Sequence, residues 1–230
     1  MDLLDCGCGR GTITSGLAEI LSPGRVVGID ISEKAVRAAD DYSGPDVESL
    51  MFRQADVYEL PFEDETFDVA FSHACLSNLQ EPVRALREIW RVLRPGGVLA
   101  IRDSDDEAPV SAPVHGPMGR WYELFAGLFR ANGGDPRFGR KLRGLAAEME
   151  FERYEIGGGY QVFAQPEETK RYAEFAAGLI SPESEGPRLV ELGLATNDEL
   201  ESLRRQILDW GDRPDVMAVW TWFHLLAWKL

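Results

Sequence analysis

An aspartate and three glycines at every second position lie near the start of the chain. Residues 5–11 read DCGCGRG and directly follow an apolar pair at residues 3–4. A second apolar segment, residues 26–29, ends at Asp30. Glycines let the backbone turn tightly and approach a ligand closely, and an aspartate after the second strand of such a unit is placed to accept hydrogen bonds from ribose hydroxyls. These residues predict a strand, a glycine-rich turn, a helix and a second strand that together bind a ribose-containing cofactor.

The spacing of the glycines distinguishes between cofactors. A dinucleotide fingerprint has the spacing G-x-G-x-x-G, and Thr12 occupies the position of its third glycine. The carboxylate of Asp5, before the first glycine, would repel a pyrophosphate but suits a ligand that carries an ammonium group. S-adenosylmethionine has an ammonium group, a ribose for Asp30 and an adenine. The pattern therefore favours S-adenosylmethionine over a nicotinamide dinucleotide.

Several motifs in order resemble those of the class I S-adenosylmethionine-dependent methyltransferases. The resemblance covers residues 1–103 and is nearest to the quinone-biosynthesis and natural-product methyltransferases. Besides the glycine motif and Asp30, it is carried by residues 54–57 (QADV), residues 60–62 (LPF), residues 67–72 (FDVAFS) and residues 91–97 (RVLRPGG).

The resemblance implies roles for individual residues. Asp5 would lie on the ammonium side of the cofactor, Asp56 would face the adenine amino group, and the backbone amide of Val57 would contact the adenine ring. The expected cofactor-binding residues are Asp5, Gly7, Cys8, Gly9, Gly11, Asp30, Ile31, Ala55, Asp56, Val57 and Ser72.

His73 is the candidate side chain for chemistry. It follows Ser72 at the carboxyl end of the predicted fourth strand, beside the expected position of the methyl group. A histidine there can act as a general base or orient the acceptor, although it can equally pack near the cofactor or bond to the backbone. Transfer from a sulfonium depends mainly on alignment of the nucleophile and exclusion of water, so the reaction does not require a sharper motif.

Other histidines and aromatic residues have alternative interpretations. His224 shares a strand face, by period two, with several tryptophans, and we expect it to be a core histidine. His115 lies in a Pro- and Gly-containing loop, where it could belong to a lid. One face of the helix predicted over residues 118–131 is aromatic and predicts core packing, with the wall of an acceptor pocket as the alternative; its members are Trp121, Tyr122, Phe125 and Phe129.

Composition narrows the class of protein. The chain has 230 residues and a formal net charge of -15, with no Lys/Arg-rich stretch, which argues against nucleic acid or an anionic membrane as partner. Its cysteines, Cys6, Cys8 and Cys75, are expected to be small buried thiols rather than zinc ligands, because few histidines and no second cysteine pair accompany them. Neither a signal peptide nor a membrane-spanning apolar run is visible, so we expect a cytoplasmic protein without a metal.

Hydrophobic periodicity predicts alternating strands and helices. The predicted strands cover residues 3–6, 25–29, 49–53, 67–72, 98–102, 151–164 and 216–230. The predicted helices cover residues 12–21, 32–41, 81–94, 118–131 and 140–150, and most of residues 166–211, with breaks at residues 181–182 and 186–187. Residues 105–117 predict a loop.

The predicted fold class is α/β, with helices on both faces of a Rossmann-like, mostly parallel sheet. The resemblance implies seven strands in the order 3-2-1-4-5-7-6, with the last two antiparallel. We expect one domain over residues 1–230, with a cofactor-binding core at residues 1–103 and a helical insertion at residues 166–215 that covers the substrate side. The insertion and the acidic charge favour a small-molecule acceptor.

The chain departs from the family at its start. Family members normally carry helices before the first strand, whereas here that strand begins at Leu3. Either the chain is truncated, or the gene starts late, or another segment covers the cofactor. A homodimer partner could also supply the missing wall, and the apolar first strand would favour pairing with a second copy. A non-catalytic S-adenosylmethionine-binding module or partner subunit is therefore the competing hypothesis. A nucleotide-dependent oxidoreductase is disfavoured by Thr12.

Overall fold

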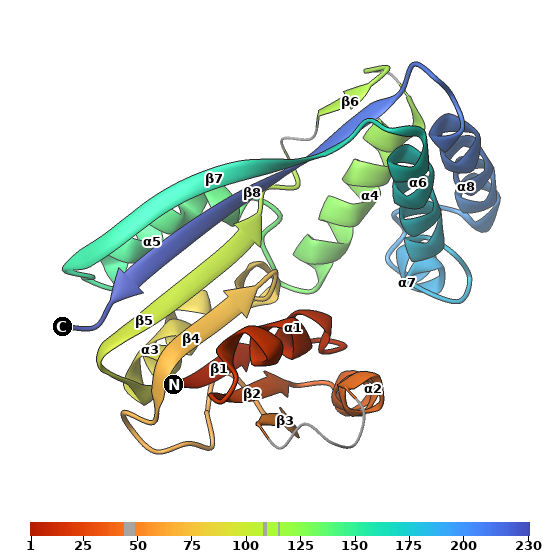
Figure 1. Cartoon of the computed structure of the whole chain (residues 1–230). Helices are drawn as coiled ribbons and strands as arrows, with labels where there is room; N and C mark the ends of the chain where they lie inside the picture. Colours follow the sequence, from red (N-terminus) through yellow and green to blue (C-terminus); the bar gives the residue numbers. More distant parts are fainter. Residues whose placement is uncertain (44–48, 108–109, 115) are drawn as a thin grey trace. The chain divides into compact units, whose positions relative to one another are not determined.

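A computed structural model describes residues 1–43, 49–107, 110–114 and 116–230, so His115 lies outside the described residues. Figure 1 labels the α-helices and strands. The elements in chain order are β1 (Asp2–Cys6), α1 (Thr12–Leu21), β2 (Arg25–Asp30), α2 (Glu33–Ser43), β3 (Leu50–Gln54), β4 (Phe67–His73), the 3-10 helix η1 (Leu76–Asn78), α3 (Pro82–Val92), β5 (Leu93–Ser104), β6 (Val110–Ala112), α4 (Pro117–Ala131), the 3-10 helix η2 (Gly139–Lys141), α5 (Leu142–Glu148), β7 (Arg153–Phe163), α6 (Pro166–Leu179), α7 (Gly186–Glu191), α8 (Asn197–Gly211) and β8 (Met217–Trp228).

The strands form a mixed sheet in the order β3-β2-β1-β4-β5-β8-β6, and β7 also pairs with β8. The pairs β1–β2, β2–β3, β1–β4 and β4–β5 are parallel. The predicted Rossmann-like fold class is confirmed, with β7 and β8 in the places of the predicted sixth and seventh strands, but the strand count and order differ slightly because the additional strand β6 also pairs with β8. Contacts divide the chain into two compact units: unit 1 holds residues 1–103, 138–157 and 223–230, and unit 2 holds residues 104–137 and 158–222.

The short strand β6 was not predicted. Its residues lie in the segment expected to be a loop and pair antiparallel with β8, Val110 opposite Val219 and Ala112 opposite Met217. The strand is defined by its backbone pairing with β8. A segment of three residues is too short for a hydrophobic alternation that would predict a strand. The expectation of an unbroken loop over residues 105–117 is therefore wrong.

Helices cover both faces of the sheet in unit 1 because neighbouring apolar residues of a strand point to opposite faces. Leu3 packs in a cluster with Ala18 of α1. Leu4 belongs to a different cluster, which includes Leu86 and Ile89 of α3. The order of apolar residues in β1 therefore explains the two helical layers.

The boundary between α3 and β5 differs from the prediction. The helix ends at Val92, not at Arg94, and β5 begins at Leu93 rather than at Val98. Leu93 already pairs with Phe67 of β4, and the guanidinium of Arg94 donates to Asp68 at 2.8 Å. Because Leu93 and Arg94 already contact β4, the helix ends before it reaches Pro95 and Gly96.

Unit 2 has its own aromatic core. Trp121 and Tyr122 of α4 are 1% and 6% exposed, which confirms that the aromatic face of this helix packs in a core. The indole N–H of Trp121 donates to the carbonyl of Ala176 at 2.8 Å. The Tyr122 and Tyr172 hydroxyls lie 2.9 Å apart in a buried hydrogen bond. The helices predicted between the last two strands are thus present as α6, α7 and α8.

Two further predictions are corrected. His224 is exposed and lies against Gly157, so it is not a core histidine. Strand β1 lies between β2 and β4, so it presents no free edge, and the expectation that it would favour pairing with a second copy is wrong. Among the residues described, no helix is long and apolar enough to cross a membrane.

Candidate functional site

The glycine-rich loop after β1 folds back onto the end of β2. The N–H groups of Gly7 and Cys8 both donate to the carbonyl of Ile29, at 2.8 and 2.9 Å. Gly7 has a φ of +79°, and a Cβ there would lie 2.5 Å from the Sγ of Cys75. Only glycine fits both the left-handed backbone and this close approach. The loop therefore presents bare backbone at the carboxyl edge of the sheet.

Asp30 ties this loop to the segment after β2. Its carboxylate accepts a hydrogen bond from the N–H of Gly9 at 3.0 Å and from the N–H of Ser32 at 2.9 Å. The second bond is an Asx-type turn that leads into α2. The two bonds fix the orientation of the Asp30 carboxylate.

Asp5 is buried at the end of β1. It is 2% exposed, and the Oγ1 of Thr14 in α1 donates to its carboxylate at 2.6 Å. The pKa of Asp5 is raised to about 6, mainly by burial; the Thr14 hydrogen bond opposes this shift and the nearby Asp30 charge adds to it. Asp5 is therefore neither a solvated turn residue nor an ordinary surface acid.

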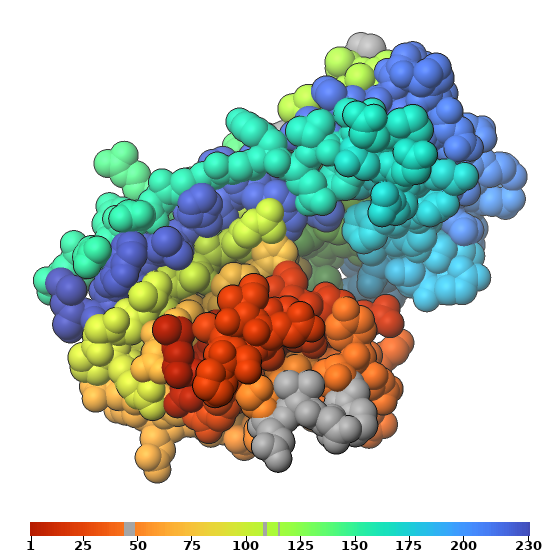
Figure 2. All heavy atoms as spheres, viewed as in Figure 1, coloured from red at the N-terminus to blue at the C-terminus, as the bar shows by residue number. Residues whose placement is uncertain are grey.

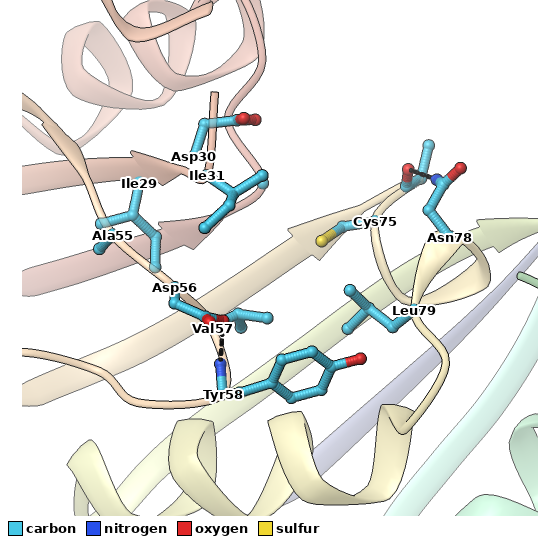
Figure 3. Close-up of a pocket in the computed structure, with 12 residues that line it drawn as sticks. Ile29, Asp30, Ile31, Ala55, Asp56, Val57, Tyr58, Cys75, Asn78 and Leu79 are labelled. Carbon is cyan, nitrogen blue, oxygen red and sulfur yellow. Dashed lines mark hydrogen bonds between the residues drawn. The ribbon is translucent and has the colours of Figure 1, made fainter. Parts of the chain in front are cut away.

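A cavity of about 410 Å³ opens beside these residues (Figure 3). Figure 3 shows Asp30 and Ile31 on one side, Asp56, Val57 and Tyr58 below, and Cys75, Asn78 and Leu79 across from Asp30. The lining residues are Gly7, Ile29, Asp30, Ile31, Ala55, Asp56, Val57, Tyr58, Ala74, Cys75, Asn78 and Leu79. These described residues include carboxylates and apolar side chains but no lysine, arginine or histidine, so the lining suits a cationic, partly apolar ligand better than a polyphosphate.

The segment after β3 supplies the lower wall. The carboxylate of Asp56 accepts a hydrogen bond from the N–H of Tyr58 at 2.9 Å, which forms a tight turn. Val57 is buried, whereas Tyr58 is half-buried and its hydroxyl accepts from the N–H of Glu81 at 3.1 Å. These contacts anchor the wall to the start of α3.

The segment after β4 supplies the opposite wall, a role that no residue pattern in it predicts. Ala74 has a φ of +52°, unusual for a residue with a side chain, and its N–H donates to the carbonyl of Arg102 at 2.9 Å. The amide of Asn78 donates back to the carbonyl of Ala74 at 3.0 Å. Burial raises the pKa of Cys75 to about 12, so its thiol is neutral. No residue pattern in this segment distinguishes Cys75 or Asn78 from packing residues.

His73 lies at the end of β4, one residue before the cavity wall. Its ring nitrogens lie 3.4 and 3.5 Å from a guanidinium nitrogen of Arg102, and its ring stacks on Phe71. Burial, with a further contribution from the Arg102 charge, lowers the pKa of His73 to about 4. The imidazole is therefore neutral at neutral pH.

The structure brings together only part of the predicted set. Gly7, Asp30, Ile31, Ala55, Asp56 and Val57 line the cavity, and Asp5, Cys8, Gly9, Gly11, Ser72 and His73 do not. Cys8, Gly9 and Gly11 belong to the same loop as Gly7, while Ser72 is fully buried in β4. The residues that do not line the cavity belong to the strands and the loop that carry its walls.

Comparisons with known proteins identify the family. Residues 4–101 match the family model described as "Methyltransferase domain". A protein of Aspergillus luteorubrus named "Probable methyltransferase ltbC" is 31% identical over 99% of this chain and 85% of its own length. The demethylmenaquinone methyltransferase of Lactiplantibacillus plantarum is 34% identical over 55% of this chain.

Coverage of these relatives varies. The chain spans 56% of the L. plantarum protein and 64% of an uncharacterized methyltransferase of Schizosaccharomyces pombe that is 34% identical over 74% of this chain. A solved structure of a phosphoethanolamine N-methyltransferase of Haemonchus contortus, which contains S-adenosylhomocysteine, has a TM-score of 0.60 at 18% identity and covers 100% of this chain and 49% of that chain. At that identity the likeness concerns the fold.

The fold, the glycine loop and these matches define a class of protein. The chain belongs to the class I S-adenosylmethionine-dependent methyltransferases, and its cofactor is S-adenosylmethionine.

Proposed function

We propose that this protein transfers the methyl group of S-adenosylmethionine to a small organic acceptor, with the cavity beside β1, β2 and β4 as its cofactor site. The observation that carries the proposal is the cavity lining. Carboxylates of Asp30 and Asp56 lie on its walls, the bare backbone of Gly7 forms its edge, and no basic side chain lines it. This lining is suited to a sulfonium ligand with ribose and adenine groups.

Each wall has a proposed partner on the cofactor. Asp30 accepts hydrogen bonds from the ribose hydroxyls, because two backbone N–H groups already hold its carboxylate in place. Asp56 and the backbone of Val57 contact the adenine. Asp5 supplies negative charge for the ammonium group from beneath the loop. Cys8, Gly9, Gly11, Ile31, Ala55 and Ser72 shape the surrounding backbone and walls.

S-adenosylmethionine supplies an electrophilic methyl group when bound. The chain's own residues orient the two reactants and exclude water from them. His73, with its neutral imidazole, is the proposed acceptor of a proton from the nucleophile. The thiol of Cys75 is neutral and therefore a poor nucleophile, which protects this wall from self-methylation.

A small acceptor is supported by the named relatives and by charge. The L. plantarum relative is named for demethylmenaquinone, a small molecule. The net charge of -15 disfavours nucleic acid. Relatives named as methyltransferases favour this function over a non-catalytic binding module.

The test is an acceptor screen with S-adenosylmethionine labelled in its methyl group. Phenols, quinols, amines and thiols are incubated with the protein, and products are identified by mass spectrometry. Labelled product with wild type, and greatly reduced product with the Asp30→Ala variant, supports the proposal. Tight cofactor binding without turnover of any acceptor class would instead support the binding-module alternative.

A further inference from the structure

A second cavity lies wholly within unit 2, beside α8. Its volume is about 660 Å³, and its lining comes from the segment after α6, from α7 and from the first half of α8. Figure 2 shows α7 and α8 (light and darker blue) at the surface of the molecule, so a ligand can approach from solvent. A cavity of this size can hold a small organic molecule.

The inner walls of this cavity are apolar. Ile180 at the end of α6 and Leu200 on α8 are buried, and Val190 on α7 is half-buried between helix and cavity. Apolar surface that faces a water-filled cavity is covered favourably by the apolar part of a ligand. The walls therefore favour a ligand with a hydrocarbon body.

The wall formed by residues 180–190 is rigid. Pro182 and Pro187 both line the cavity, and the ring of each proline fixes its φ angle. Between them, the N–H of Gly186 donates to the carbonyl of Ser181 at 3.0 Å. A Cβ on Gly186 would lie 2.6 Å from the same carbonyl oxygen, so this close approach requires glycine. The cavity is therefore formed in advance of ligand binding, which lowers the entropic cost of binding.

Arg204 is the one basic side chain among the described residues that line the cavity. It is half-buried on α8, and its Nε donates to the carbonyl of Ala177 in the last turn of α6 at 3.2 Å. This bond uses one of the five N–H groups of the guanidinium and leaves its two terminal amino groups for a ligand. No carboxylate of a described residue pairs with Arg204, whereas Arg188 and Arg205 nearby both pair with glutamates.

The other charge on the lining is already compensated. Glu201 accepts a hydrogen bond from the guanidinium of Arg205 at 2.9 Å. The described lining thus carries one positive charge without a counterion, on Arg204, in a chain whose net charge is -15. A half-buried charge of this kind is stabilised by an anion that shares its desolvated surroundings.

We propose that this cavity binds a small monocarboxylate with an apolar body, whose carboxylate pairs with Arg204. The two terminal amino groups of a guanidinium match the two oxygens of a carboxylate, and one positive charge balances one negative charge. A phosphate dianion would bring a second charge that the lining does not balance. The apolar body of the ligand covers Ile180, Val190 and Leu200. The proposal does not depend on the proposed methyl transfer, because the cavity shares no residue with the cofactor site.

The first test is calorimetric titration of the full chain with octanoate as the probe. Acetate has the same charge but little apolar surface, and octanol has the apolar body without the charge. We expect saturable binding of octanoate that is at least about tenfold tighter than that of either comparison compound, the scale of hydrogen bonds to a charged group. No saturable binding of octanoate at millimolar concentration, or equal affinity for octanoate and octanol, would overturn the proposal.

The second test places the carboxylate at Arg204. Arg204→Gln should weaken octanoate binding by at least about tenfold and leave octanol binding unchanged. The matched control is Arg171→Gln on α6, where the guanidinium also donates through Nε to a helix carbonyl, that of Glu167 at 3.1 Å, but does not line the cavity. The control should bind octanoate as wild type does. Equal weakening in both variants, or none in Arg204→Gln, would overturn the assignment.

A third variant has the opposite expected effect and changes an exposed side chain, so it does not depend on the folding of Arg204→Gln. Glu201→Gln removes the negative charge from the cavity lining and should tighten octanoate binding by about twofold, the scale of a solvent-exposed charge interaction, without changing the affinity for octanol. Unchanged or weaker octanoate binding in this variant would contradict recognition of a negative charge.

Discussion

The carboxylate of Asp30 accepts a hydrogen bond from the backbone N–H of Gly9 at a distance of 3.0 Å. Through this bond the end of β2 holds the glycine loop that follows β1. The second carboxylate oxygen accepts from the N–H of Ser32 at 2.9 Å. Asp30 thus orders the cavity rim and, in our proposal, binds the ribose.

Replacing Asp30 with alanine should weaken the binding of S-adenosylmethionine by about 1–3 kcal/mol, the scale of a lost hydrogen bond to a charged group. Isothermal titration calorimetry measures the change. Asp30 also accepts hydrogen bonds from the N–H groups of Gly9 and Ser32, so the substitution lowers affinity by disordering the loop as well as by removing the ribose contact. A 2′-deoxy analogue of the cofactor separates the two effects. If the analogue loses as much affinity in the variant as the natural cofactor does, the ribose assignment is wrong.

The affinity for S-adenosylmethionine should rise with pH through about 6. Burial raises the pKa of Asp5 to about 6, so the folded protein holds this proton more tightly than the unfolded chain. The stability that Asp5 contributes is therefore fully present below pH 3.8 and is lost as pH rises through 6. A bound ammonium group favours the ionised carboxylate. Titrations at several pH values between roughly pH 5 and pH 8, around that pKa, measure the effect.

Two variants test the assignment of this pH dependence to Asp5. Asp5→Asn should bind weakly across the range and show no inflection near pH 6. Thr14→Val removes the hydrogen bond that lowers the Asp5 pKa, so its inflection should move to higher pH. An inflection that persists in Asp5→Asn would assign the titration to another group.

Adding a methyl group at Gly7 should damage the site more than adding one at Gly16 of α1. The left-handed φ of +79° alone disfavours alanine by about 1–2 kcal/mol, and the Cβ would also clash with Cys75. We expect Gly7→Ala to lower thermal stability and cofactor affinity together. Gly16→Ala, on α1 with nothing within 4 Å of its Cβ, should be neutral or stabilising. Equal behaviour of the two variants would contradict the close-packing account.

The role of His73 can be separated from simple packing by pH. Its pKa is lowered to about 4, so the neutral imidazole contributes no inflection in activity between pH 6 and pH 8, the range in which an unperturbed histidine, with a pKa of about 6.5, would titrate. Its buried neutral form makes the fold less stable as pH falls from 6.5 toward 4, because the unfolded chain then binds more protons. His73→Gln should lower kcat and leave cofactor affinity unchanged. A loss confined to cofactor affinity would exclude a role as base.

Local patterns in the sequence predicted the glycine-rich turn and the position of Asp30 at the end of β2. The glycines of residues 7–11 and Asp30 lie where a βαβ unit requires them, because positive φ and a carboxylate after β2 are properties of single residues. Cys75 and Asn78 were missed, since their position depends on the left-handed turn at Ala74, which alanine does not signal. His224 was misplaced because alternation identifies a strand face but not how deeply that face is buried.

The central claim is that the cavity binds S-adenosylmethionine, and calorimetric titration tests it most directly. The protein is titrated in parallel with S-adenosylmethionine, S-adenosylhomocysteine and NAD. The account predicts saturable one-to-one binding of the first two and no heat of binding with NAD, since the cavity has acidic walls and no basic lining residue. Binding of NAD without binding of S-adenosylmethionine would contradict it.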